Sequence, residues 1–133
     1  MNNRGIFGLA IVLGIAMLAN GTYMTITPES WYWMVPGVAD RGPFNQHFVR
    51  DIGINYMLIG GAYVLGAIYV KHRFVLWLAP TAWLLGHGLF HGWEVLVGIC
   101  GPEALLVDFG GVTLPALLGI GLVYVAWKRV GDE

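Results

Sequence analysis

Histidine and carboxylate side chains fall at helical spacing in two otherwise apolar stretches of this sequence. His87, His91 and Glu94 stand at positions i, i+4 and i+7, and His47 and Asp51 stand at i and i+4. A helix places residues at these spacings on one face. Imidazole and carboxylate groups on facing helices form the usual interior metal site of a helical bundle. The spacing therefore predicts a metal site where two helix faces meet.

The predicted ligands suit several transition metals. Imidazoles with one or two carboxylates bind Zn, Fe, Cu or Mn, and the residue types do not distinguish these ions. The predicted four-ligand core is His47, Asp51, His87 and His91, and Glu94 is either a fifth ligand or a base beside metal-bound water. Glu94 or Asp51 is accordingly the predicted catalytic group, acting on that water or on a substrate proton.

Three further polar residues, Asn20, Asn55 and Asp108, are predicted to orient the ring N–H of a ligating histidine. A different interpretation is that all these groups make hydrogen-bonded contacts between helices. Haem is the alternative cofactor, held between His47 and His91 or between His87 and a partner chain. Six glycines would let a flat ring approach the backbone: Gly53, Gly60, Gly61, Gly86, Gly88 and Gly92. Close helix packing is the favoured explanation of these glycines.

The composition is that of a membrane protein. The 133 residues are 57% hydrophobic and 11% charged, and the mean hydropathy is +0.68, whereas a soluble domain has about 25% charged residues. This composition predicts an all-α integral membrane four-helix bundle in a single domain. The net charge of −1 excludes a nucleic-acid partner, because no basic patch is available for phosphates. A single cysteine excludes an intrachain disulfide.

Four apolar segments are long enough to cross a bilayer, at about residues 5–26, 47–70, 74–99 and 109–127. The first is longer than the apolar run of a usual signal peptide and therefore predicts a transmembrane helix. Residues 27–46 hold three prolines and several aromatic residues, a composition typical of an interfacial segment in the first outer loop. Asn45, at the end of this loop, is the predicted N-cap of the second span.

Basic residues gather at one end of the predicted spans. They are Arg4, Lys71, Arg73, Lys128 and Arg129, whereas the opposite loops are mainly acidic. The positive-inside rule then predicts that both termini are cytoplasmic. The predicted location is the bacterial inner (cytoplasmic) membrane, with the chain crossing it several times and the lipid bilayer as its partner.

The polar side chains of the spans fall mainly in the outer half. Asp51 and Glu94 each lie five residues from the outer boundary, roughly 7–8 Å deep at ~1.5 Å per residue. Asn55 and His91 share a deeper level, and His87 is the deepest, near mid-bilayer. The inner half consists of Leu, Val, Ile, Ala and Gly. This distribution predicts a polar pocket open to the outer side.

Two sequence motifs carry a resemblance to known proteins. Residues 45–53 contain N-x-H-F-V-R-D-x-G, and residues 87–91 contain H-x-x-F-H. The chain resembles a group of small, uncharacterised four-span bacterial membrane proteins that carry both motifs. The resemblance implies a four-helix fold in which the four-ligand core belongs together, and it implies no activity. The four-span architecture is also similar to that of DoxX-like proteins, at the level of fold alone.

These observations predict a metal-dependent membrane protein, an oxidoreductase or hydrolase that acts at the outer face on a small or lipid-soluble substrate. One alternative is an accessory subunit of a larger membrane complex, such as a respiratory or oxygenase assembly. The expected protein partners are the other subunits of such a complex or further copies of this chain in a homo-oligomer. A third hypothesis is a metal or proton carrier. It ranks last because the apolar inner half offers no polar relay beyond His87.

Overall fold

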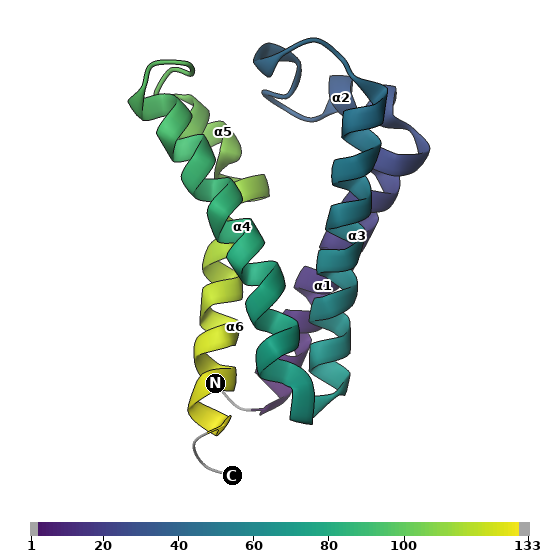
Figure 1. Cartoon of the computed structure of the whole chain (residues 1–133), viewed down its shortest axis with the longest axis vertical. Helices are drawn as coiled ribbons and strands as arrows, with labels where there is room; N and C mark the ends of the chain where they lie inside the picture. Colours follow the sequence, from purple (N-terminus) through teal and green to yellow (C-terminus); the bar gives the residue numbers. More distant parts are fainter. Residues whose placement is uncertain (1–2, 131–133) are drawn as a thin grey trace. The chain divides into compact units, whose positions relative to one another are not determined.

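The computed structural model describes residues 3–130, and these residues are almost entirely helical (Figure 1). The α-helices are α1 (Asn3–Ile26), α2 (Pro28–Met34), α3 (Gln46–Ile68), α4 (Arg73–Leu96), α5 (Ala104–Asp108) and α6 (Leu114–Val130). Two short 3₁₀ turns are η1 (Ala39–Arg41) and η2 (Val70–His72), and η3 (Phe109–Thr113) is a π-helical turn. No strand occurs within residues 3–130. The predicted all-α fold class is confirmed.

Three helical segments are long and apolar enough to cross a membrane, which indicates a membrane protein. They are Arg4–Ile26, Gln46–Ile68 and Ala104–Arg129, the last of which combines α5, η3 and α6. Helix α4 has 24 residues, enough to cross ~30 Å of hydrocarbon at ~1.5 Å per residue. It is not among the three, since two histidines and a glutamate lower its hydropathy. Four-span topology therefore stays a prediction.

The last span begins earlier than its sequence pattern suggests. The expected start is at about residue 109, but the helical segment begins at Ala104. Ala104 is buried, and the following Leu105 and Leu106 favour a helix. Asp108 consequently lies at the end of helix α5 rather than in a loop, with its side chain at a defined place on a helix.

The chain divides into two compact units, residues 1–64 and residues 65–133, named here the N-terminal unit and the C-terminal unit. The N-terminal unit holds α1, α2, η1 and most of α3. The C-terminal unit begins in the last turn of α3 and continues through α4, α5, η3 and α6. The single-domain organisation stays a prediction.

Glycines bring α1 and α3 into backbone contact in the N-terminal unit. A Cβ atom added to Gly14 would lie 2.8 Å from the carbonyl oxygen of Gly60, and one added to Gly53 would lie 2.9 Å from that of Gly21. The two glycines of each helix are seven residues apart, so both contacts fall on one helix face. These four residues form a glycine seam of the kind that packs transmembrane helices closely. For Gly53 and Gly60, the helix-packing interpretation is confirmed. It is wrong for Gly61, Gly86 and Gly92, because an added Cβ atom there meets nothing within 4 Å.

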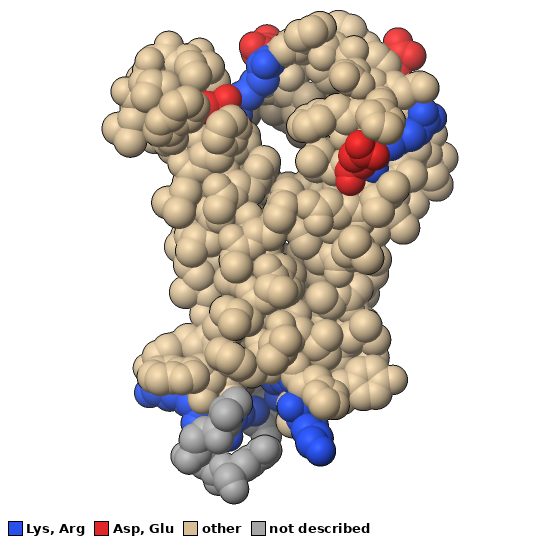
Figure 2. Space-filling model, viewed as in Figure 1, with Lys and Arg blue, Asp and Glu red and all other residues tan. Residues whose placement is uncertain are grey.

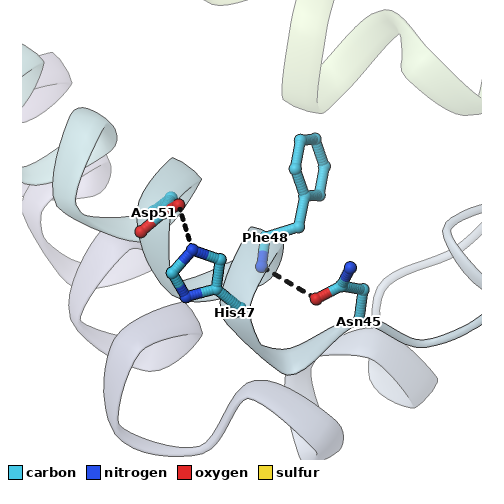
Figure 3. Close-up of polar contacts among 4 residues, drawn as sticks. All are labelled: Asn45, His47, Phe48 and Asp51. Carbon is cyan, nitrogen blue, oxygen red and sulfur yellow. Dashed lines mark hydrogen bonds and ion pairs between the residues drawn. The ribbon is translucent and has the colours of Figure 1, made fainter.

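The loop between α1 and α3 in the N-terminal unit contains a short helix and the predicted helix cap. Helix α2 follows α1 directly, and the Tyr32 hydroxyl donates to the carbonyl oxygen of Gly42 at 2.6 Å. The Asn45 Oδ1 atom accepts a hydrogen bond from the backbone N–H of Phe48 at 3.1 Å (Figure 3). Asn45 is therefore the N-cap of α3, as predicted. The cap fixes where α3 begins and hence where His47 points.

Helices α4 and α6 pack against each other in the C-terminal unit (Figure 1). Trp77 and Leu84 of α4 and Leu122 of α6 are almost completely buried. At the turn into α4, the Arg73 guanidinium donates to the last carbonyl groups of α3, at 2.9 Å to Gly66 and 3.0 Å to the next residue. These bonds satisfy carbonyl groups that a helix C-terminus leaves unpaired.

The π-helical turn η3 lies between Asp108 and Pro115. Pro115 has no N–H group, and in a regular α-helix its ring would clash with the carbonyl group four residues earlier. Here the backbone N–H of Leu114 bonds to the carbonyl oxygen of Phe109, five residues earlier. The wider turn accommodates the proline. It also adds a residue to the helical turn just after Asp108 and thereby changes which way the rest of the span faces.

Candidate functional site

His91 and Asp108 form a hydrogen-bonded pair in the C-terminal unit. The His91 Nδ1 atom lies 2.8 Å from the Asp108 Oδ2 atom, and the two side chains are only 15% and 13% exposed. A carboxylate at this distance accepts a hydrogen from Nδ1, which leaves the lone pair of the ring on Nε2. The geometry thus fixes both the orientation of the imidazole and the atom that can bind a metal or accept a proton.

Aromatic rings extend this pair along one face of α4. The His87 and His91 ring centroids are 4.6 Å apart with the rings nearly perpendicular. The Trp83 ring stacks on His87 at 5.0 Å and 20°. The name His91 cluster is used here for Trp83, His87, His91 and Asp108. One turn beyond His91, the Oε2 atom of Glu94 is buried. His87, His91 and Glu94, which the sequence analysis selects from their spacing, thus occupy successive turns of α4.

His47 and Asp51 pair with each other in the N-terminal unit. The His47 Nε2 atom lies 3.2 Å from the Asp51 Oδ2 atom, and the side chains point toward one another from successive turns of α3 (Figure 3). Their exposed fractions are 87% and 57%. Water or lipid headgroups can therefore reach both groups, and the pair holds its geometry only weakly.

The predicted orienting residues differ in their surroundings. Asn20 accepts a hydrogen bond from the Trp31 indole N–H at 2.9 Å and lies 3.6 Å from the Met24 sulfur, so it ties α1 to α2. Asn55 is half-buried on α3. Asp108 lies beside a histidine, which is the contact that an orienting residue needs.

The five predicted ligands are divided between the two units. His47 and Asp51 belong to the N-terminal unit, and His87, His91 and Glu94 belong to the C-terminal unit. Within residues 3–130, no three His, Cys, Asp or Glu side chains are grouped closely enough to hold a metal ion as they stand. The predicted meeting of the two helix faces stays a prediction.

Two features of the His91 cluster are missing from the sequence predictions. The first is the π-turn after Asp108, and the signal for it is Pro115 inside an otherwise helical run. Such turns occur frequently at functional sites. The second is the stacking of Trp83 on His87, for which the i, i+4 spacing is the signal.

No family model, curated protein or solved structure matches the chain. The resemblance of its two motifs to four-span bacterial membrane proteins therefore stays an expectation. What the His91 cluster does is inferred from its own chemistry.

Proposed function

We propose that the protein is a multi-pass membrane protein that binds a transition metal ion at the His91 cluster. The observation that carries this proposal is the contact between His91 Nδ1 and Asp108 Oδ2 at 2.8 Å. A carboxylate behind the distal ring nitrogen is the usual support of a metal-ligating histidine, because it fixes the tautomer and raises the basicity of the ligand.

In this proposal His91 is the primary ligand through its Nε2 atom. His87 lies one turn before it and Glu94 almost one turn after it, so both can reach an ion near Nε2 after rotation about their side-chain bonds. Rotation is required because the side chains as they stand form no three-ligand group within residues 3–130. His91, His87 and Glu94 would hold the ion, and the chemistry it would supply is that of a Lewis acid toward a water or substrate.

The proposed topology has four spans, with α4 as the third and both termini in the cytoplasm. Its support is the distribution of charge: basic residues flank one end of the four segments, and acidic residues flank the other. The histidines of α4 then lie in the outer half of a bacterial inner membrane. Polar groups at this depth are rare and are typical of functional positions.

A second candidate function is metal-free proton transfer by His91. The absence of a ready three-ligand group within the described part of the chain favours it. An imidazole whose Nδ1 donates to a carboxylate is also the usual arrangement of a general base. The neighbouring Phe90 and Trp93 are about half exposed, so a lipid-soluble substrate can approach this side of α4.

Metal content decides between the two candidates. Purified protein is stripped with a chelator, supplied separately with Zn²⁺, Cu²⁺, Fe²⁺ or Mn²⁺, and assayed by elemental analysis after removal of free ion. The metal proposal expects about one ion per chain, lost in His91→Ala. Asp108→Asn keeps the side-chain shape but weakens the support of the ring, and should lower the affinity by about 10- to 100-fold.

His72→Ala is the matched control, because His72 is an exposed histidine in the η2 turn of the same unit. It should bind metal as the unsubstituted protein does. Substoichiometric metal in every preparation would reject the metal proposal and leave proton transfer. Equal loss in His72→Ala and His91→Ala would show that binding is not specific to the cluster.

A further inference from the structure

Positive charge gathers at one end of the C-terminal unit (Figure 2). The residues are Lys71 in η2, Arg73 at the start of α4, and Lys128 and Arg129 at the end of α6. These four residues are named the basic end. Within residues 65–130, the three acidic residues are Glu94, Glu103 and Asp108, and all lie toward the opposite ends of the helices. None of these three acidic residues lies at the basic end, and Asp132 and Glu133, which follow Arg129 in the sequence, lie outside the described residues.

Arg73 makes two kinds of contact at the basic end. The Arg73 guanidinium lies 5.0 Å from the centre of the Trp77 ring and donates to the carbonyl groups at the end of α3. These contacts fix the guanidinium in place. Burial and the charge of Arg129 both lower the pKa of Arg73. Like charges held near one another in this way attract an anion.

Aromatic side chains indicate the kind of anion. The Lys128 Nζ atom lies 4.8 Å from the centre of the Tyr124 ring, and Tyr124 and Trp127 are 51% and 60% exposed. Exposed tyrosine and tryptophan at the end of a span typically lie at headgroup level. The cations beside them are therefore at the height of lipid phosphates, with apolar helix surface below for the acyl chains.

We propose that the basic end is a binding site for the phosphodiester group of an anionic phospholipid. Lys128 and Arg129 contact the phosphate from α6, Lys71 contacts it from the η2 turn, and Arg73 adds fixed charge. Basic clusters between helices at the cytoplasmic surface are suited to such headgroups. The inference rests on the membrane-spanning part of the proposed function and is independent of metal binding.

Native mass spectrometry of the protein in a neutral detergent tests this site. Phosphatidylglycerol and phosphatidylcholine with the same acyl chains are titrated separately. Each cation near an anionic headgroup is expected to contribute about fivefold in affinity. The protein should therefore prefer phosphatidylglycerol by about 25-fold or more, and Lys128→Gln with Arg129→Gln should remove about 25-fold of this preference.

Three controls make the result specific. Lys128→Arg keeps the charge and should keep the preference, and Arg41→Gln removes a positive charge from the N-terminal unit and should also keep it. An excess of inorganic phosphate should not displace the lipid. Equal binding of the two lipids, an Arg41→Gln loss as large as that of the double variant, or displacement by inorganic phosphate would each overturn the proposal.

Two further measurements keep the test decisive. If the double variant does not fold, the single Lys128→Gln change at an exposed position should still remove about fivefold of the preference. Metal content is measured on the same preparations. Failure of the lipid site leaves the metal content unchanged, whereas failure of the metal site leaves the lipid preference unchanged, so the two proposals are tested separately.

Discussion

His47 and Asp51 pair on the exposed surface of one helix, whereas His91 and Asp108 pair between two helical segments with most of their surface buried. The first pair is four residues apart in sequence, and the second is 17 residues apart. Exposed pairs contribute little, because water competes for both partners. A partly buried pair holds its geometry and is costly to break. The same two residue types thus give a weak surface contact in one place and an oriented imidazole in the other.

The helix packing around the exposed pair also differs from the packing around the partly buried pair. In the N-terminal unit, the glycine seam brings backbones together and leaves the polar pair on an outer face. In the C-terminal unit, α4 packs against α6, and large side chains such as Leu84 of α4 and Leu122 of α6 are almost completely buried. The polar pair there lies within the helical packing.

The largest expected loss of stability comes from disrupting the glycine seam of the N-terminal unit. In Gly53→Leu, the added side chain meets the Cβ atom of Met24 at 2.8 Å and the carbonyl oxygen of Gly21 at 2.9 Å. Because backbone must move, we expect a loss of more than about 3 kcal/mol in the free energy of unfolding, the upper end of ordinary overpacking. Denaturant unfolding in detergent micelles measures it.

Gly61→Leu is the control for this change, since a Cβ atom there meets nothing within 4 Å. Removing a helical glycine should stabilise the protein by up to about 1 kcal/mol. Equal destabilisation by the two variants would mean that the glycine seam does not hold the unit together.

The next effect in size is that of breaking the partly buried pair. His91→Ala leaves Asp108 without the imidazole and should cost about 2–3 kcal/mol in unfolding free energy, less than a fully buried pair would. Asp108→Asn retains a hydrogen-bonding group and should cost about 1 kcal/mol. The same unfolding measurement applies. If both changes were neutral, the contact would not hold α5 to α4.

Removing the N-cap of α3, which precedes the exposed pair, should have an intermediate effect on the free energy of unfolding. Asn45→Ala removes the side-chain oxygen that accepts the Phe48 N–H and should cost about 1 kcal/mol. Asn45→Asp keeps the acceptor and should retain most of the stability. An aspartate variant as unstable as the alanine variant would show that the oxygen is not what matters at this position.

The smallest expected effect on stability is that of breaking the exposed pair. His47→Ala removes one partner of the exposed pair and should change the unfolding free energy by less than about 0.5 kcal/mol. Measured beside His91→Ala, it gives the ratio of the two pairs directly. Costs of similar size would show that burial does not separate them.

Much of the fold could be predicted from the sequence because it depends on local patterns. Apolar runs predict the long helices, and Asn45 before such a run predicts the cap that the structure contains. The i, i+4 spacing of His47 and Asp51 predicts their contact, since it requires only that α3 be a helix.

The candidate site could be predicted only in part because it depends on packing. Helical spacing places His87 and His91 on one face of α4, but it does not determine which neighbouring helix that face packs against. The contact of His91 with Asp108 depends on the helix start at Ala104 and on the π-turn before Pro115. The sequence selects Asp108 as an orienting group, and its role behind a bound metal stays a prediction.

The central claim is that the partly buried pair, and not the exposed pair, supports metal binding. The most direct measurement compares the metal affinity of His91→Ala with that of His47→Ala in one titration series, using the ion that the stripped protein takes up most tightly. We predict that His91→Ala abolishes stoichiometric binding and that His47→Ala leaves the affinity within about twofold, because an exposed pair contributes little. Equal loss in both variants would contradict this account and favour the four-ligand core of His47, Asp51, His87 and His91 that the sequence predicts.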